Sequence, residues 1–344
     1  MRLLSLLLVG SLFLLPVSAL EIQAPAPPGD ALERMPEESS SLETGLREVV
    51  INAVSGLHPD LQEAARVSLG ILAAAVLMSV LDAASYGGKT AVLAGVVAVA
   101  SALLLSTDSL IRLATDTILE IGAYGKLLLP VMTAALAAQG GVTASAALCA
   151  GTALFSSVLQ TVLTNWMVPG TYLYLALGIG SCATGEELLS RLAGMLKGVL
   201  SWSMKILVTV FTTYLSLTGV VSGTTDAAAL KAAKVGMSTF VPVVGGALSD
   251  ASEAVLVSAQ LLKNAAGIYG ILAVLAIFLH PFLRIGLHYL ILKLTGAVCA
   301  VFGGREITRT VDAFASAMGL LLGMTACGCV LVLISTVCFL KGAV

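Results

Sequence analysis

The amino-acid sequence predicts an all-α fold, a polytopic transmembrane helical bundle of about six to eight spans with broken or re-entrant and interfacial amphipathic helices. Composition is the first reason. Of the 344 residues, 58% are hydrophobic and 11% are charged, whereas a soluble domain carries about 25% charged residues. The second reason is that apolar runs recur at close to the roughly 20 residues that one span requires. The third is a mildly apolar helix–break–helix pattern at residues 219–267, with hydrophobic runs on both sides.

Residues 1–19 are expected to form a signal peptide that is cleaved. Arg2 supplies the positive start, Leu3 to Leu15 supply the apolar core, and Val17-Ser18-Ala19 is a small-x-small cleavage site. Cleavage would place the new N-terminus outside the cytoplasm. An uncleaved membrane anchor is the alternative.

Residues 20–66 are predicted to form an acidic extracytoplasmic tail. Residues 21–66 contain nine acidic side chains and three arginines. One interpretation is a solvated leader that precedes the membrane domain, and the other is a docking arm for an extracytoplasmic partner. Residues 67–344 are then expected to form one multi-pass membrane domain, whose first two spans are Val67–Ala84 and Thr90–Ser106.

Residues 107–126 interrupt the apolar pattern with a charged stripe. Asp108, Arg112, Asp116 and Glu120 follow one another at four-residue steps, so they share one face of a helix. The segment is expected to be a surface helix in the membrane interface. In the alternative, Arg112 and Asp116 belong to a polar path through the membrane, because charges inside a bilayer usually face water-filled cavities.

Two regions carry small residues at four-residue spacing, which is typical of faces where transmembrane helices pack closely. The first region is the apolar block Leu127–Asn165, which is interrupted at Gln139-Gly140-Gly141 and is expected to be a re-entrant or tight helical hairpin, or one long tilted helix. The second is the last span, Val311–Leu340. The predicted packing residues are Gly141, Ser145, Cys149, Ala153, Gly319 and Gly323.

A second polar group, His280, Arg284 and His288, also has four-residue spacing. The three side chains would share a face if a helix continued through Pro281, and they could then form a proton or anion relay. The favoured interpretation is an interfacial break between two spans, with Pro281 at the bend and Arg284 at the lipid headgroups.

The stretch 219–267 is expected to contain two short helices separated by a break at Pro242, Gly245 and Gly246. Proline lacks the N–H that a helix interior needs, and glycine permits backbone angles that other residues resist. The first helix is expected to begin at Asp226. The second is expected to begin near Ser249-Asp250 and to stop at Gly267.

The sequence contains no P-loop, no HExxH, no GxSxG and no paired-carboxylate cluster. Its six cysteines lie in or beside apolar runs without metal-ligand spacing, and it has no basic patch suited to nucleic acid. We therefore expect a protein that is not an enzyme, with no catalytic, cofactor-binding or metal site.

The stretch 219–267 also carries a pattern that resembles the stage III sporulation protein AE family of endospore-forming bacteria. The resemblance rests on a long pattern and extends more loosely over most of the chain after the tail. The matching positions are Gly223, Asp226, Lys234, Phe240 to Gly245, Ser249-Asp250-Ala251, Leu261 to Asn264, and Gly267.

This resemblance implies a non-enzymatic membrane subunit of a channel or secretion-like complex that links mother cell and forespore and is needed for late forespore development. It implies other stage III sporulation A-operon proteins and a forespore protein as partners, an oligomeric assembly, and contact with membrane lipid. It places the chain in the bacterial cell membrane as a multi-pass protein, in the mother-cell-derived outer forespore membrane.

A stand-alone secondary transporter is the alternative function. Its hallmark would be two matching discontinuous helices in repeated halves of the chain. The breaks at 139–141 and 242–246 are about 100 residues apart, although no sequence repeat surrounds them. An inverted repeat whose two breaks meet at mid-membrane would favour the transporter. A lone protomer with a wide exposed apolar flank and no enclosed site would favour the assembly subunit.

Overall fold

The computed structural model describes residues 24–36, 42–83, 89–138, 142–240, 245–301 and 305–341, and these ranges contain helices and no strand. The predicted signal peptide lies outside them. The elements are η1 (Gly29–Ala31), α2 (Leu42–Ser55), α3 (His58–Ala83), α4 (Lys89–Ala138), α5 (Val142–Val162), the π-helical η2 (Leu163–Met167), α6 (Val168–Thr184), α7 (Glu187–Phe240), α8 (Gly245–Val301) and α9 (Arg305–Lys341).

The predicted all-α, multi-pass class is confirmed. Within the described residues, five helical segments are long and apolar enough to cross a membrane. These segments are His58–Val80, Val92–Ala135, Glu187–Tyr214, Ala265–Val301 and Arg305–Leu340. The helices are longer than a membrane requires, because the 50 residues of α4 extend over about 75 Å and the hydrocarbon core is only about 30 Å thick.

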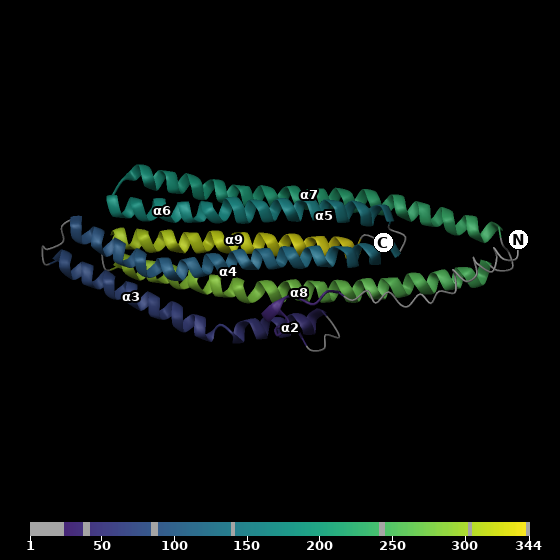
Figure 1. Cartoon of the computed structure of the whole chain (residues 1–344), viewed down its shortest axis with the longest axis horizontal. Coiled ribbons are helices and arrows are strands. Elements are labelled where there is room, and N and C mark those ends of the chain that lie inside the picture. Colours follow the sequence, from purple (N-terminus) through teal and green to yellow (C-terminus); the bar gives the residue numbers. More distant parts are fainter. Residues whose placement is uncertain are drawn as a thin grey trace, which may run out of the picture.

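The bundle has a centre and two flanks (Figure 1). Helices α4, α8 and α9 pack together in the centre, α2 and α3 lie along one side, and α5, α6 and α7 lie along the other. In the most hydrophobic window of each span, 61% of α9 is buried inside the protein, compared with 11% of α7. Phe314, Met318 and Leu321 of α9 are fully buried, so α9 is the helix around which the core is built.

The segment 107–126 is not a separate interfacial helix, which corrects the prediction. It is the middle of α4, which continues without a break from Lys89 to Ala138. Its apolar side chains explain this, because Leu110, Ile111 and Ala114 are buried in the common core. The four-residue charge spacing correctly identified a polar face, but the opposite face packs against protein.

The block Leu127–Asn165 forms a helical hairpin, one of the two predicted alternatives. Helix α4 ends at Ala138, α5 begins at Val142, and the two helices pack against each other. Farther along, η2 joins α5 to α6 without interrupting the helical path. Pro169 lies at the start of α6 and cannot donate a backbone hydrogen bond, which accounts for a local change to wider π-helical bonding here.

The stretch 219–267 forms the end of α7 and the beginning of α8. Helix α7 ends at Phe240 and α8 begins at Gly245, and Pro242, the predicted break residue, lies outside the described residues. The two short helices were a wrong prediction, because both flanking helices continue into the neighbouring spans. Gly267 does not stop a helix; a Cβ atom there would collide with Leu340, so its missing side chain lets α8 and α9 approach closely. In Figure 1 the ends of α7 and α8 project beyond the other helices, and we call residues 219–240 and 245–264 the projecting arm.

Candidate functional site

His280, Arg284 and His288 lie on one continuous helix, so the predicted interfacial break at Pro281 is wrong. Helix α8 runs from Gly245 to Val301 with Pro281 inside it. A proline inside a membrane helix loses one backbone hydrogen bond, which neighbouring helices can compensate. The spacing of four residues then places the three side chains on one side of α8, which we call the α8 polar face.

The α8 polar face contacts the connection between α2 and α3, residues 56–57, which we call the elbow. The ring Nδ1 of His280 lies 3.3 Å from the carbonyl oxygen of Ala53. Because a carbonyl oxygen only accepts, Nδ1 must carry the hydrogen and donate it. Ala53 belongs to the last turn of α2, where carbonyl groups lack partners within the helix, so His280 caps the end of α2.

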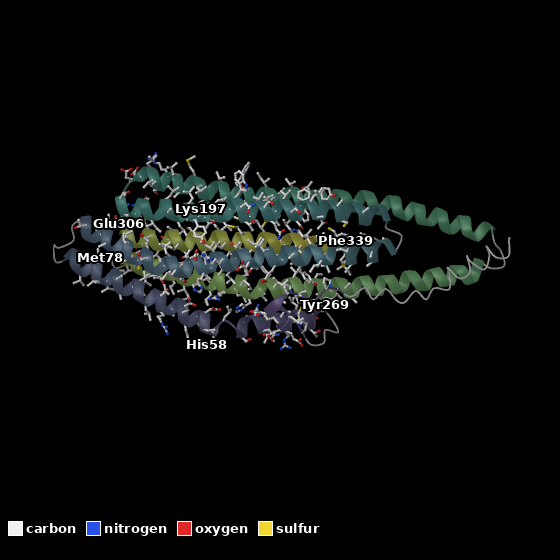
Figure 2. The ribbon with its side chains drawn as sticks, in the orientation of Figure 1. His58, Met78, Lys197, Tyr269, Glu306 and Phe339 are labelled. Carbon is white, nitrogen blue, oxygen red and sulfur yellow. The ribbon has the colours of Figure 1, made fainter. Side chains whose placement is uncertain are left out.

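The elbow approaches His280 closely at Gly56. A Cβ atom at this position would lie 3.2 Å from Cε1 of the His280 ring, which is tighter than ordinary contact. Glycine therefore allows the backbone between α2 and α3 to rest on the histidine. His58, labelled in Figure 2, opens α3 directly after this elbow.

Arg284 forms ion pairs with two carboxylates of α3. Its Nε lies 2.9 Å from Oδ1 of Asp60, and its terminal nitrogen lies 3.5 Å from Oε2 of Glu63. The Nε–H is not aligned for a hydrogen bond, so the attraction to Asp60 is mainly electrostatic. Asp60 lies in the first turn of α3, where the helix dipole also favours a negative charge. The Asp60 side chain is 10% exposed, and Arg284 supplies the positive charge that lies against it.

These contacts differ from what the sequence predicted for residues 20–66. The second half of the expected acidic tail packs on this chain's own bundle, an arrangement that neither sequence interpretation included. Val49 and Ala53 of α2 are buried, and α3 begins at His58, within the expected tail. We call the contact of Ala53, Asp60 and Glu63 with His280 and Arg284 the docking seam.

Arg112 and Asp116 do not join the docking seam by any hydrogen bond or ion pair found among the described residues. Arg112 Nε lies 2.9 Å from Oδ2 of Asp108 in the same helix. The other oxygen of Asp108 accepts a hydrogen bond of 2.6 Å from the Tyr172 hydroxyl of α6. Asp116 is exposed. The five predicted polar-path residues therefore belong to two separate groups on α4 and α8.

The predicted packing residues have unequal surroundings. Gly319 lies against Tyr289 of α8, and Gly323 lies against the Met204 side chain of α7. Cys149 and Ala153 are half-buried against the core. Gly141 and the side chain of Ser145 lie outside the described residues. Gly245 and Gly246 open α8.

Sequence reasoning missed Gly151, which lies directly against Tyr214 of α7. A glycine among other small residues gives no distinguishing signal in the sequence. The elbow residues Asp60 and Glu63 were also missed. Their position at the start of a helix with an apolar remainder was a usable signal.

The chemical groups needed for a metal site do not come together in the part of the chain that the structure describes, where no group of three or more His, Cys, Asp or Glu side chains is found. Two cavities lined by described residues each have a volume of about 10 Å³ for the centre of a water molecule. That is room for one water, whereas ligand pockets measure about 300–1,000 Å³.

Comparison with known proteins identifies the family. The family model for stage III sporulation protein AE matches residues 37–342. The stage III sporulation protein AE of Bacillus subtilis (strain 168) is 27% identical over 202 residues, which are 59% of this chain and 51% of that protein. The match therefore spans about half the length of this relative. No solved structure matches. Because the family model covers most of the sequence, the chain belongs to the stage III sporulation protein AE family.

Proposed function

We propose that this sporulation-family membrane protein is a non-enzymatic subunit of a channel or secretion-like complex that links mother cell and forespore and is needed for late forespore development. Its partners in this proposal are the other stage III sporulation A-operon proteins, a forespore protein and membrane lipid, in an oligomeric assembly without nucleic acid. Its location in this proposal is the mother-cell-derived outer forespore membrane.

The observation that carries the proposal is the projecting arm. The arm contains nearly all of the stretch whose residue pattern resembles the family, and it extends beyond the ends of α4, α5 and α9 (Figure 1). The two helical segments of the arm have 22 and 20 residues and therefore extend about 30–33 Å along the axis. An extension of this length supports contact with a neighbouring protein.

Uneven burial of the spans supports the same proposal. The most hydrophobic window of α7 is 11% buried and that of α3 is 22% buried. On α7 the exposed apolar side chains recur at steps of three and four residues, which is the spacing of helix-packing seams. These side chains are Leu188, Leu192, Met195, Val199, Trp202 and Ile206. A wide apolar flank suits both lipid and companion helices.

The stand-alone transporter has less support. It requires two discontinuous helices whose breaks meet near mid-membrane. In this fold the ends of α4 and α5 that flank one break lie at the end of the bundle, whereas the ends of α7 and α8 that flank the other lie farther out, at the tip of the arm (Figure 1). No observation favours this function specifically.

The double variant Pro242→Ala/Gly245→Ala tests the proposal in sporulating cells. Alanine favours helix at both positions, so the break between α7 and α8 is expected to straighten, the partners to be lost and sporulation to fail while membrane insertion is retained. Pro130→Ala is the matched control, because Pro130 lies inside α4 and is exposed. A double variant that is stable and sporulates normally would overturn the role of the break.

A further inference from the structure

A small cavity lies beside the docking seam, between α3, α4, α8 and α9, and its wall is mostly apolar with a few polar side chains. Among the residues that line it are Ser68 of α3, Thr107 of α4, His288 of α8 and Met318 of α9. The cavity volume is about 10 Å³ for the centre of a water molecule. This is close to the roughly 10–15 Å³ that one water needs, and it excludes any larger ligand.

Ser68 lines this cavity, and its hydroxyl group is unused. The residue is 7% exposed, and its Oγ has no hydrogen-bond partner within the described part of the chain. Serine and threonine in membrane helices usually donate to a carbonyl one turn earlier, as Ser101 does to Val97 at 2.7 Å. Ser68 does not, and a buried hydroxyl without a partner is rare in folded proteins.

His288 supplies a complementary group from the other side. It is 5% exposed, and its Nδ1 lies 3.0 Å from the Arg284 carbonyl oxygen. Since that oxygen only accepts, Nδ1 carries the hydrogen, and in this tautomer Nε2 is a hydrogen-bond acceptor. The ring therefore has one nitrogen committed to α8, and its other nitrogen belongs to a residue that lines the cavity.

We propose that this cavity binds one water molecule, which bridges Ser68 Oγ and His288 Nε2 and joins α3 to α8. The water donates to Nε2 and exchanges a hydrogen bond with the Ser68 hydroxyl, and Thr107 lies on the cavity wall as a third polar partner. Two to four polar partners are what a buried water requires. The N-terminal segment is then held at two depths, by the Asp60–Arg284 ion pair at the elbow and by the water about two turns farther along α3.

Radiolytic oxidation of the full chain in lipid nanodiscs tests this site. Hydroxyl radicals form from bound water as well as from bulk water, and methionine is readily oxidised to the sulfoxide. Met318 and Met324 are both fully buried on α9, but only Met318 lines the cavity. A bound water is expected to make the oxidation of Met318 faster than that of Met324. Equal rates at the two methionines would overturn the proposal.

The variant Ser68→Ala gives an independent test through the sign of its effect. If the hydroxyl bonds to a water, alanine removes that bond, and the apparent unfolding midpoint falls by about 1–4 °C. The excess oxidation of Met318 also falls. If the hydroxyl is simply unpaired, alanine removes a buried polar group, and the midpoint rises or stays the same, which would overturn the water site. Ser109→Ala is the control, because Ser109 is exposed on α4, and it is expected to change neither quantity.

Discussion

The charged stripes of α4 and α8 have the same spacing and different surroundings. On α4, the Arg112 side chain is 75% exposed and pairs within its own helix. On α8, the Arg284 side chain is 30% exposed and pairs with carboxylates of α3. Four-residue spacing therefore identifies a face of a helix, whereas the element that covers this face decides what the charges do. Four variants test the difference, and their expected effects decrease in the order Arg284→Gln, Gly56→Val, His280→Ala and Arg112→Ala.

Arg284→Gln is expected to have the largest effect. It leaves the nearly buried Asp60 carboxylate without a compensating charge, and removing one partner of a buried pair costs about 3–5 kcal/mol. Because Arg284 and Glu63 are partly exposed, we expect about 1–3 kcal/mol. Hydrogen exchange over residues 42–66 should accelerate accordingly. The charge-swapped pair Asp60→Arg/Arg284→Asp should recover part of the protection, and unchanged exchange in Arg284→Gln would contradict the docking seam.

Gly56→Val is expected to have the next largest effect. The new side chain would press against the His280 ring, since a Cβ atom alone already approaches it at 3.2 Å. Overpacking of this kind costs about 1–3 kcal/mol when neighbours cannot move, and the lower value is expected at this exposed elbow. The measurement is protease cleavage between α2 and α3. Gly70→Val is the control because open space surrounds Gly70, and equal cleavage of the two variants would argue against close docking at the elbow.

His280→Ala is expected to have a small effect on stability and none on function. It removes one hydrogen bond to the Ala53 carbonyl, worth about 1 kcal/mol. Sporulation efficiency should equal that of the unmodified chain. A variant that is stable and inserted in the membrane but fails to sporulate would instead support a relay through the α8 polar face.

Arg112→Ala is expected to have the smallest effect. Its ion pair with Asp108 lies on the surface within one helix, and such pairs contribute little. The unfolding midpoint and hydrogen exchange of residues 42–66 should both remain unchanged. A loss of stability and of exchange protection as large as that of Arg284→Gln would contradict the proposed difference between the charged stripes of α4 and α8.

The sequence was sufficient to predict the helical membrane class and the helical hairpin that α4 and α5 form within the block Leu127–Asn165. These features follow from local composition and from the backbone preferences of proline and glycine. It did not predict that α8 continues through Pro281, because neighbouring helices decide whether a proline ends a membrane helix.

The docking seam also lay beyond sequence reasoning. Asp60 and Arg284 are 224 positions apart in the chain, and no local pattern connects them. An acidic segment at the surface and an acidic segment docked on a basic side chain have the same composition. The buried environment of Ser68 likewise depends on four helices that meet only in the folded bundle.

The projecting arm can be tested most directly in sporulating cells by a photo-crosslinking amino acid placed at Lys231, near the end of α7, and separately at Leu290, an exposed position of α8 outside the arm. If the arm docks companion proteins, the probe at position 231 will capture other stage III sporulation A-operon proteins at a much higher yield than the probe at 290. Equal yields at the two positions, or lipid adducts alone at position 231, would contradict the proposed function.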